Sequence, residues 1–188
     1  MGNIILLNYP TFSSLVDKIF EVVAFGNADA LKELLGEAEK VERKAALVNA
    51  RTDYEALSVT PLMEAASSGE KHLVKILLAA GAKVDEVGEG ELADRWTSLH
   101  YAAYGGHTAV VKLLVEGGAV LDKKDSRNTT PLMLAVDERN YKTVAYLRKK
   151  GASLTAVDDF GRNALDLAEE IEYVEAREKM LEILLPSS

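Results

Sequence analysis

The chain is 188 residues long, 48% of its residues are hydrophobic, and its formal net charge is -8. This length predicts one domain with a sizeable core. The acidic balance argues against general binding to nucleic acid or to an anionic membrane, because both require a positive field. The sequence contains no Cys, which excludes disulfides, thiolate chemistry and cysteine-type zinc sites.

The N-terminal segment MGNIILLNYP contains a short apolar run from Ile4 to Leu7. No basic region precedes this run, and it is too short for a signal sequence or a membrane span. Gly2 follows Met1 as in N-myristoylated proteins, but that pattern requires Ser or Thr at the position of Leu6, so we do not expect the modification. We therefore expect a protein of the cytoplasm or the nucleus.

Helical segments recur along the rest of the chain. A first pair is expected to open at Ser14, which has capping-box spacing to Asp17, and to continue through DKIFEVVAFGNADALKELLG. Four clearer copies follow at intervals of 37, 33 and 33 residues, starting at Thr60, Thr97, Thr130 and Asn163. Such a period predicts a solenoid in which neighbouring repeats share one continuous core.

Each copy predicts two helices followed by a finger-like turn. Thr60 can cap the first helix, and Pro61 fits the first helical position, where a missing N–H costs nothing. Gly69 turns the chain into a second helix with an apolar stripe at helical spacing. Gly81 ends that helix in the left-handed region. The equivalent positions in the next two copies are Thr97, Gly106 and Gly118, and then Thr130, Pro131, Arg139 and Gly151.

These copies resemble the ankyrin repeat, which has a period of 33 residues and opens on Thr-Pro-Leu-His-x-Ala. The best copy reads TSLHYAAYGGH from Thr97 to His107. The resemblance covers residues of about 15–185. It implies an all-α ankyrin-repeat solenoid of about five stacked helix-turn-helix repeats with finger-like turns and degenerate terminal caps. We expect a single domain over 1–188, with an N-terminal extension over 1–14 and repeats over 15–57, 58–94, 95–127, 128–160 and 161–188.

Three features depart from the repeat pattern. The first repeat is about ten residues longer than the period, and the stretch GEAEKVERKAALVN predicts a lengthened second helix or an extra turn. The second repeat has four additional residues in the finger EVGEGELADRW, which either contribute to binding or are tolerated surface variation. Arg139 occupies the turn position of Gly69 and Gly106. Because Asn140 tolerates the left-handed region better, this turn either shifts by one residue or is strained.

The three histidines do not indicate catalysis or a metal site. The resemblance implies that His100 hydrogen-bonds the backbone of adjacent turns and that His107 occupies a scaffold position, while His72 is expected to face solvent. No third metal ligand, phosphate loop or nucleophile elbow is evident. We therefore expect no enzyme, no catalytic residue, no metal and no cofactor. The residues that serve the repeat itself are Thr60, Pro61, Thr97, His100, Gly106, His107, Thr130 and Pro131.

The resemblance implies that a partner protein binds through the concave face, formed by the fingers and the first helices. At its centre we expect Trp96, Tyr101 and Tyr104 to act as an aromatic anchor, because the repeat does not require aromatic residues at these positions and hot spots cluster centrally. The alternative is that Trp96 only braces the lengthened finger. The other predicted contact residues are Asp94, Arg127, Asp137, Glu138 and Phe160.

Charge is unevenly distributed along the chain. The segment from Val157 to the C-terminus has nine acidic and three basic residues, and so carries -6 of the total. We therefore predict a non-enzymatic, monomeric interaction module whose partner protein carries an apolar anchor and a basic segment. Two roles remain open: a regulator that masks a basic surface of its partner, or a host-directed effector or inhibitor that occupies a partner's active site. A small enzyme or ligand-binding protein would need a convergent polar pocket.

Overall fold

The computed structural model describes residues 11–40, 42–52, 57–90 and 94–185. The predictions made for Gly2 and for the apolar run from Ile4 to Leu7 lie outside these residues. The described part of the chain is helical, apart from turns, loops and one isolated antiparallel β-bridge between Ser58 and Glu89. The fold is the expected all-α ankyrin solenoid.

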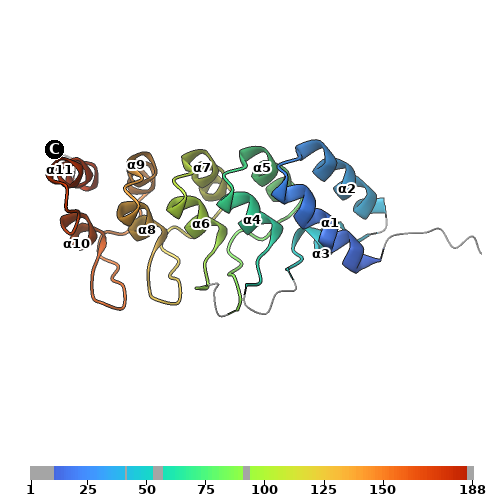
Figure 1. The fold of residues 1–188 in the computed structure, drawn as a ribbon, viewed down its shortest axis with the longest axis horizontal. Coiled ribbons are helices and arrows are strands. Elements are labelled where there is room, and N and C mark those ends of the chain that lie inside the picture. The colour runs from blue at the N-terminus through green and yellow to red at the C-terminus, as the bar shows by residue number, and fades with distance from the viewer. Residues whose placement is uncertain (1–10, 41, 53–56, 91–93, 186–188) are drawn as a thin grey trace, which may run out of the picture.

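The helices form two rows (Figure 1). The first helix of each repeat contacts the first helices of its neighbours, and the second helices do the same in the other row, while the fingers project beyond the row of first helices. The first helices are α1 (Phe12–Ala24), α4 (Pro61–Ser67), α6 (Ser98–Tyr104), α8 (Pro131–Asp137) and α10 (Ala164–Glu169). The second helices are α2 (Ala28–Lys40), α5 (Lys71–Ala79), α7 (Thr108–Glu116), α9 (Tyr141–Lys149) and α11 (Val174–Leu184), and a short α3 (Lys44–Val48) follows α2.

Threonine caps start the central first helices as predicted. The hydroxyl of Thr60 accepts the N–H of Met63 at 3.3 Å, and the hydroxyl of Thr130 accepts that of Met133 at 3.3 Å. Prolines follow both threonines at the start of the helix. The capping box predicted at Ser14 is wrong, because α1 starts at Phe12 and the Thr11 hydroxyl accepts the N–H of Ser14 at 3.3 Å. Ser14 therefore lies inside the first turn of the helix.

The turn at Arg139 keeps its position. Arg139 itself has a φ of 55°, whereas Asn140 has a φ of -78° and precedes the first residue of α9. The alternative of a turn shifted by one residue is therefore wrong, and a side chain with a Cβ adopts the left-handed conformation that glycine adopts at Gly69 and Gly106. Arg139 is exposed, and it lines an open hollow together with Lys179 and Ile183 of α11.

Both expected forms of the first-repeat insertion are present. Helix α2 has 13 residues, whereas α5, α7 and α9 have nine each, and α3 adds a short extra helix. Leu47 and Val48 of α3 are fully buried, so the insertion adds to the core. In the second finger, residues 91–93 lie outside the described residues, and Glu89 pairs with Ser58 of the preceding finger.

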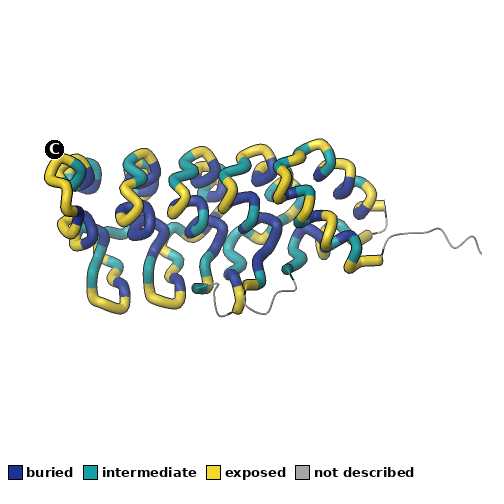
Figure 2. The backbone as a smooth tube through the Cα atoms, in the orientation of Figure 1, coloured by how far each residue is buried: buried dark blue, intermediate teal, exposed yellow. Residues whose placement is uncertain are grey.

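The core runs without a break between the two rows, where buried backbone segments face one another along the whole stack (Figure 2). Fully buried leucines recur at equivalent positions of the first and second helices in three repeats: Leu62 and Leu77, Leu99 and Leu114, and Leu132 and Leu147. No helix within the described ranges is both long and apolar enough to cross a membrane.

Candidate functional site

A groove of about 300 Å³ lies where the fingers meet α6, α8 and α10. Apolar side chains from three repeats line it, and charged side chains of the fingers border it. Six of the eight predicted contact residues line this groove, namely Asp94, Trp96, Tyr104, Arg127, Asp137 and Phe160. The remaining lining residues are Thr129, Met133, Leu134, Asp158, Arg162 and Leu167. Of the other two predicted residues, Tyr101 packs against Trp96, and Glu138 is exposed outside the lining.

Trp96 is the centre of an aromatic cluster. Its ring centroid lies 5.1 Å from that of Tyr101 in an edge-on arrangement and 5.3 Å from that of Tyr104. Its Nε1–H donates to Oδ2 of Asp125 in the next finger at 3.0 Å. Trp96 is half-buried and lines the groove, so one end of the indole is fixed to a neighbouring finger while part of the ring stays accessible. Trp96 therefore braces the neighbouring finger and also presents part of its ring to the groove.

Tyr101 and Tyr104 differ in accessibility although both contact Trp96. Tyr104 is 48% exposed and lines the groove. Tyr101 is partly buried, and burial together with nearby Glu64 and Asp94 raises the pKa of its hydroxyl. Tyr101 is thus a neutral support beneath the tryptophan, and Tyr104 is the tyrosine that a ligand in the groove would meet.

Adjacent fingers are joined tip to tip. The N–H of Ser126 donates to the carbonyl oxygen of Asp94 at 2.9 Å, and the N–H of Asp159 donates to that of Arg127 at 3.1 Å. The guanidinium of Arg127 also pairs with the carboxylate of Asp94 at 3.0 Å. Two predicted contact residues thus largely neutralise each other at the rim, and the fingers form a connected wall.

Two aspartates that sequence reasoning missed shape these fingers. Asp125 is buried and accepts the N–H groups of Arg127 and Thr129 at 2.8 and 2.7 Å, besides that of the Trp96 indole. Asp158 accepts the N–H groups of Phe160 and Arg162 at 2.9 Å in the same way. The two aspartates lie one repeat period apart in the sequence, and this recurrence was the signal that could have identified them.

Asp158 also forms the most buried ion pair of the groove. Burial opposes its ionisation, but hydrogen bonds from the backbone N–H and the guanidinium of Arg162 outweigh this effect, so the pKa of Asp158 is lowered. Arg162 in turn contacts Glu170 at 2.9 Å. Asp137 and Glu138, by contrast, are exposed and form no ion pair with any described residue, so they leave this face with acidic charge.

The comparisons with known proteins support the same architecture. A family model described as ankyrin repeats (3 copies) matches residues 19–125 and 62–158. The chain belongs to the ankyrin repeat family. It is 34% identical over 145 residues to Protein glp-1 of Caenorhabditis elegans, which is 73% of this chain and 10% of that protein.

Two further relatives contain a similar ankyrin region. Ankyrin repeat and KH domain-containing protein mask-1 of Caenorhabditis elegans is 32% identical over 134 residues, which is 71% of this chain and 5% of that protein. Putative palmitoyltransferase ZDHHC13 of Danio rerio is 32% identical over 161 residues, which is 86% of this chain and 23% of that protein. The chain thus spans at most 23% of the length of these three relatives.

Two histidines hold neighbouring ankyrin repeats together. His100 is buried; its Nδ1 accepts the N–H of Thr97 at 3.1 Å, and its Nε2 contacts the carbonyl oxygen of Thr129 in the next repeat at 3.3 Å. Desolvation by burial lowers the pKa of His100. His107 reaches backward instead, and its Nε2 contacts the carbonyl oxygen of Ser67 at 2.9 Å. His72 is exposed. Across the described residues, no group of three His, Cys, Asp or Glu could hold a metal ion.

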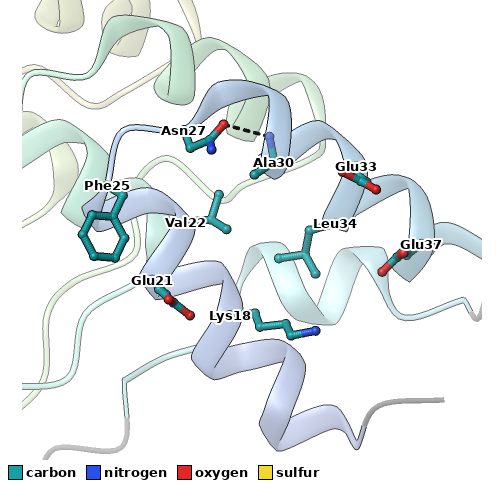
Figure 3. A pocket seen from close by; sticks show the side chains of 9 residues that line it. All are labelled: Lys18, Glu21, Val22, Phe25, Asn27, Ala30, Glu33, Leu34 and Glu37. Carbon is teal, nitrogen blue, oxygen red and sulfur yellow. Dashed lines mark hydrogen bonds between the residues drawn. The ribbon is translucent and has the colours of Figure 1, made fainter. Parts of the chain in front are cut away.

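A second hollow, of about 430 Å³, lies at the N-terminal end of the ankyrin stack between α1 and α2 (Figure 3). Phe25 at its edge is 79% exposed, and Glu21, Glu33 and Glu37 also line it. It contains none of the predicted contact residues, and it lies on the side of α1 and α2 where no described repeat covers them. Such a hollow is typical of the outer side of a terminal repeat among the described residues, because each repeat buries apolar surface only against the next.

Proposed function

We propose that this ankyrin repeat protein is a non-enzymatic module that binds a partner protein on the face formed by its fingers and first helices. The supporting observation is the groove itself, in which Trp96 and Tyr104 present aromatic surface at the middle of the stack. Aromatic residues supply large contact area at low entropic cost and dominate many protein interfaces. The repeat pattern does not require an aromatic residue at either position, although the Trp96 indole also donates to Asp125 of the next finger.

The charges around the groove favour a partner with a basic segment next to its apolar anchor. Asp94 and Asp158 are already paired with arginines, whereas Asp137 and Glu138 are exposed without an ion pair in the described structure. The acidic C-terminal repeat extends the same sign of charge beyond the groove. Long-range attraction of this kind raises association rates and specificity more than affinity.

The proposed role is that of a monomeric regulator or assembly factor of the cytoplasm or nucleus that masks a basic surface of its partner. An effector or inhibitor that occupies a partner's active site uses the same groove and is the second candidate. The identity of the captured partner distinguishes the two. Ankyrin regions also occur in relatives named as a putative palmitoyltransferase and as a probable E3 ubiquitin-protein ligase, XBOS31 of Oryza sativa subsp. japonica.

The test is capture of partners from a cell lysate by the wild-type protein and by the double variant Trp96→Ala, Tyr104→Ala, read out by mass spectrometry. We expect the double variant to lose partners that the wild type retains, because truncation of a central aromatic hot spot costs about 2 kcal/mol or more, roughly a 30-fold loss of affinity. The matched control is Phe25→Ala, Tyr173→Ala, which truncates two exposed aromatic side chains outside the groove.

Two further measurements test the groove without altering the fingers and test the contribution of charge to binding. Tyr104→Ala alone leaves the hydrogen bond between Trp96 and Asp125 intact, so it tests the groove without disturbing the fingers. Capture should also weaken as the salt concentration rises, since salt screens exposed charges. Capture that is equal for the wild type and the double variant contradicts the aromatic anchor, and capture that is indifferent to salt contradicts the acidic attraction.

A further inference from the structure

A cluster of positive charge lies on the opposite side of the stack from the groove. The segment 139–150 contains five basic and no acidic residues in a chain whose net charge is -8. It forms the turn before α9, the helix α9 itself and the residue after it. In Figure 1, α9 lies between α7 and α11 in the row of second helices, away from the fingers.

The exposed cations converge from three helices. On α9, Lys142, Ala145 and Lys149 are exposed at the spacing of one helical face, and Arg139 and Lys150 lie exposed at the two ends of the helix. Helices α7 and α11 on either side contribute two more exposed lysines. We call this set the basic strip; it comprises Lys112, Arg139, Lys142, Lys149, Lys150 and Lys179.

Tyrosines support the basic strip without neutralising it. The Nζ of Lys179 lies 4.3 Å from the ring centroid of Tyr141. The Nζ atoms of Lys112 and Lys150 lie 5.6 and 5.5 Å from that of Tyr146. Such contacts hold an ammonium group in place and leave its charge available.

No cation of the basic strip forms an ion pair with a residue that the structure describes, although eight ion pairs occur among those residues. Arg148 differs, because it is partly buried and donates to the carbonyl oxygens of Leu184 and Ala152 at 3.2 and 3.1 Å. Its role is therefore structural, and it is not part of the basic strip.

A hollow of about 500 Å³ lies at one end of the basic strip. Three cations line it, together with the apolar surface of Tyr141, Ala145 and Ile183 and the polar groups of Thr108, Asn140 and Thr143, and no acidic residue lines it. The cations are Arg139, Lys142 and Lys179. Cations around an apolar hollow suit a polypeptide that alternates carboxylates with aliphatic side chains. The neighbouring helices also carry exposed acids, Glu116 on α7 and Glu175, Glu178 and Glu182 on α11, which limit the positive region to α9 and its edges. A long polyanion such as RNA would run onto these acids.

We propose that the basic strip binds an acidic peptide segment of a partner protein, as a second interaction surface independent of the aromatic groove. Carboxylates of the segment pair with Lys142 and Lys149, and an aliphatic side chain enters the hollow beside Ala145 and Ile183. The pairing is specific because the remainder of the protein is acidic and repels the same segment. One ankyrin stack thus offers an acidic face with an aromatic groove and a basic face with an aliphatic hollow.

The experiment measures fluorescence anisotropy of a labelled peptide of alternating glutamate and leucine residues, titrated with the full chain at low salt. The wild type should bind this peptide and should not bind the same peptide with glutamine in place of glutamate. The variant Lys142→Gln, Lys149→Gln should weaken binding about five- to tenfold, since two exposed ion pairs are lost. The matched control, Lys71→Gln, Lys75→Gln, removes two exposed lysines from α5, the equivalent helix of another repeat, and should bind as the wild type does.

Any of four outcomes would overturn the proposal. One is equal binding of the glutamate and glutamine peptides, and another is an equal loss in the two double variants. The third is tighter binding of a single-stranded RNA oligonucleotide than of the acidic peptide. The fourth is a salt-sensitive dimer of the protein alone, detected by sedimentation, that the variant Lys142→Gln, Lys149→Gln no longer forms. In that case a second copy of the chain, and not an acidic peptide, would occupy the basic strip. Tyr104→Ala should leave peptide binding unchanged. The proposal for the groove and the proposal for the basic strip are therefore tested independently.

Discussion

At the scale of single residues, some side chains join neighbouring repeats and others line the groove. His100 and His107 contact backbone carbonyls of neighbouring repeats, whereas Trp96 and Tyr104 line the groove at positions where the repeat pattern requires no aromatic residue. His100 has a direct link to pH, because it is buried, uncharged and hydrogen-bonded at both ring nitrogens.

We expect His100 to make the protein less stable as the medium becomes mildly acidic. Desolvation lowers the pKa of His100 in the folded state, so below about pH 6.5 the unfolded chain binds a proton that the folded chain does not. The free energy of unfolding should therefore fall as the pH decreases through this value, until the pKa of the folded state is reached. Asp158, whose pKa is lowered, contributes at more acidic pH, where stability is lost as the pH falls through its folded-state pKa.

The measurement is urea denaturation between about pH 7.5 and about pH 5.5. His100→Gln should have a smaller pH dependence than the wild type, and His72→Gln, at an exposed position, is the matched control. An unchanged slope in His100→Gln would show that other groups cause the pH dependence.

At the scale of helices and turns, the fit between neighbouring repeats decides which residues are allowed. A Cβ at Gly69 would lie 2.5 Å from Nδ1 of His107, and one at Gly106 would meet the side chain of Asn140. Glycine at these turns is therefore required both by the left-handed backbone and by the close approach of the next repeat. Arg139 has the same backbone conformation but is exposed, so only the backbone requirement applies there.

This difference predicts opposite effects of substitutions at equivalent turns. Arg139→Gly should raise the free energy of unfolding by about 0.5–1 kcal/mol, because it removes a Cβ from the left-handed region. Arg139→Asn should give a smaller gain of the same sign. Gly106→Ala should lower the free energy of unfolding by about 1–2 kcal/mol or more, since backbone strain and the clash with Asn140 add. Chemical denaturation of the three variants provides the measurement, and a destabilised Arg139→Gly would mean that the arginine side chain stabilises the turn.

At the scale of the whole molecule, the stability of each repeat depends on the repeats that pack beside it. Each central repeat packs against a repeat on both sides, whereas the described terminal helices pack against a neighbouring repeat on one side. The stability of a stack of this kind is approximately the sum of its repeats and their interfaces. The groove extends from α6 at the middle of the stack to α10 in the last repeat.

We therefore expect amide hydrogen exchange to be slowest in α6 and α7 and faster in α1 and α11. Leu114→Ala, at a fully buried central position, should cost about 2–5 kcal/mol and speed exchange across several repeats. Leu184→Ala is also at a fully buried position, but in the last helix, and should speed exchange mainly in α11 and its neighbour α9. Mass spectrometry of exchanged peptides measures both effects, and uniform exchange along the stack would mean that the array unfolds as one cooperative unit.

The sequence alone was enough to determine the repeat, because the residues that define it act locally. Thr60 caps its own helix and Pro61 begins that helix, so both roles can be read from short spacings. The same local patterns misplaced the start of α1, where Thr11 and Ser14 are both capping residues by type and only the backbone hydrogen bonds decide between them.

Only the tertiary structure showed what the residues at the variable positions contact, because their partners lie about a full repeat away. Asp125 is 29 residues from Trp96, and their hydrogen bond showed that the tryptophan both braces a finger and lines the groove. The convergence of Lys112, Lys142 and Lys179 likewise needs three helices to pack side by side before their charges meet. Local spacing specifies a helix or a turn, whereas a surface forms only when repeats stack, and the stacking brings together residues that no short pattern connects.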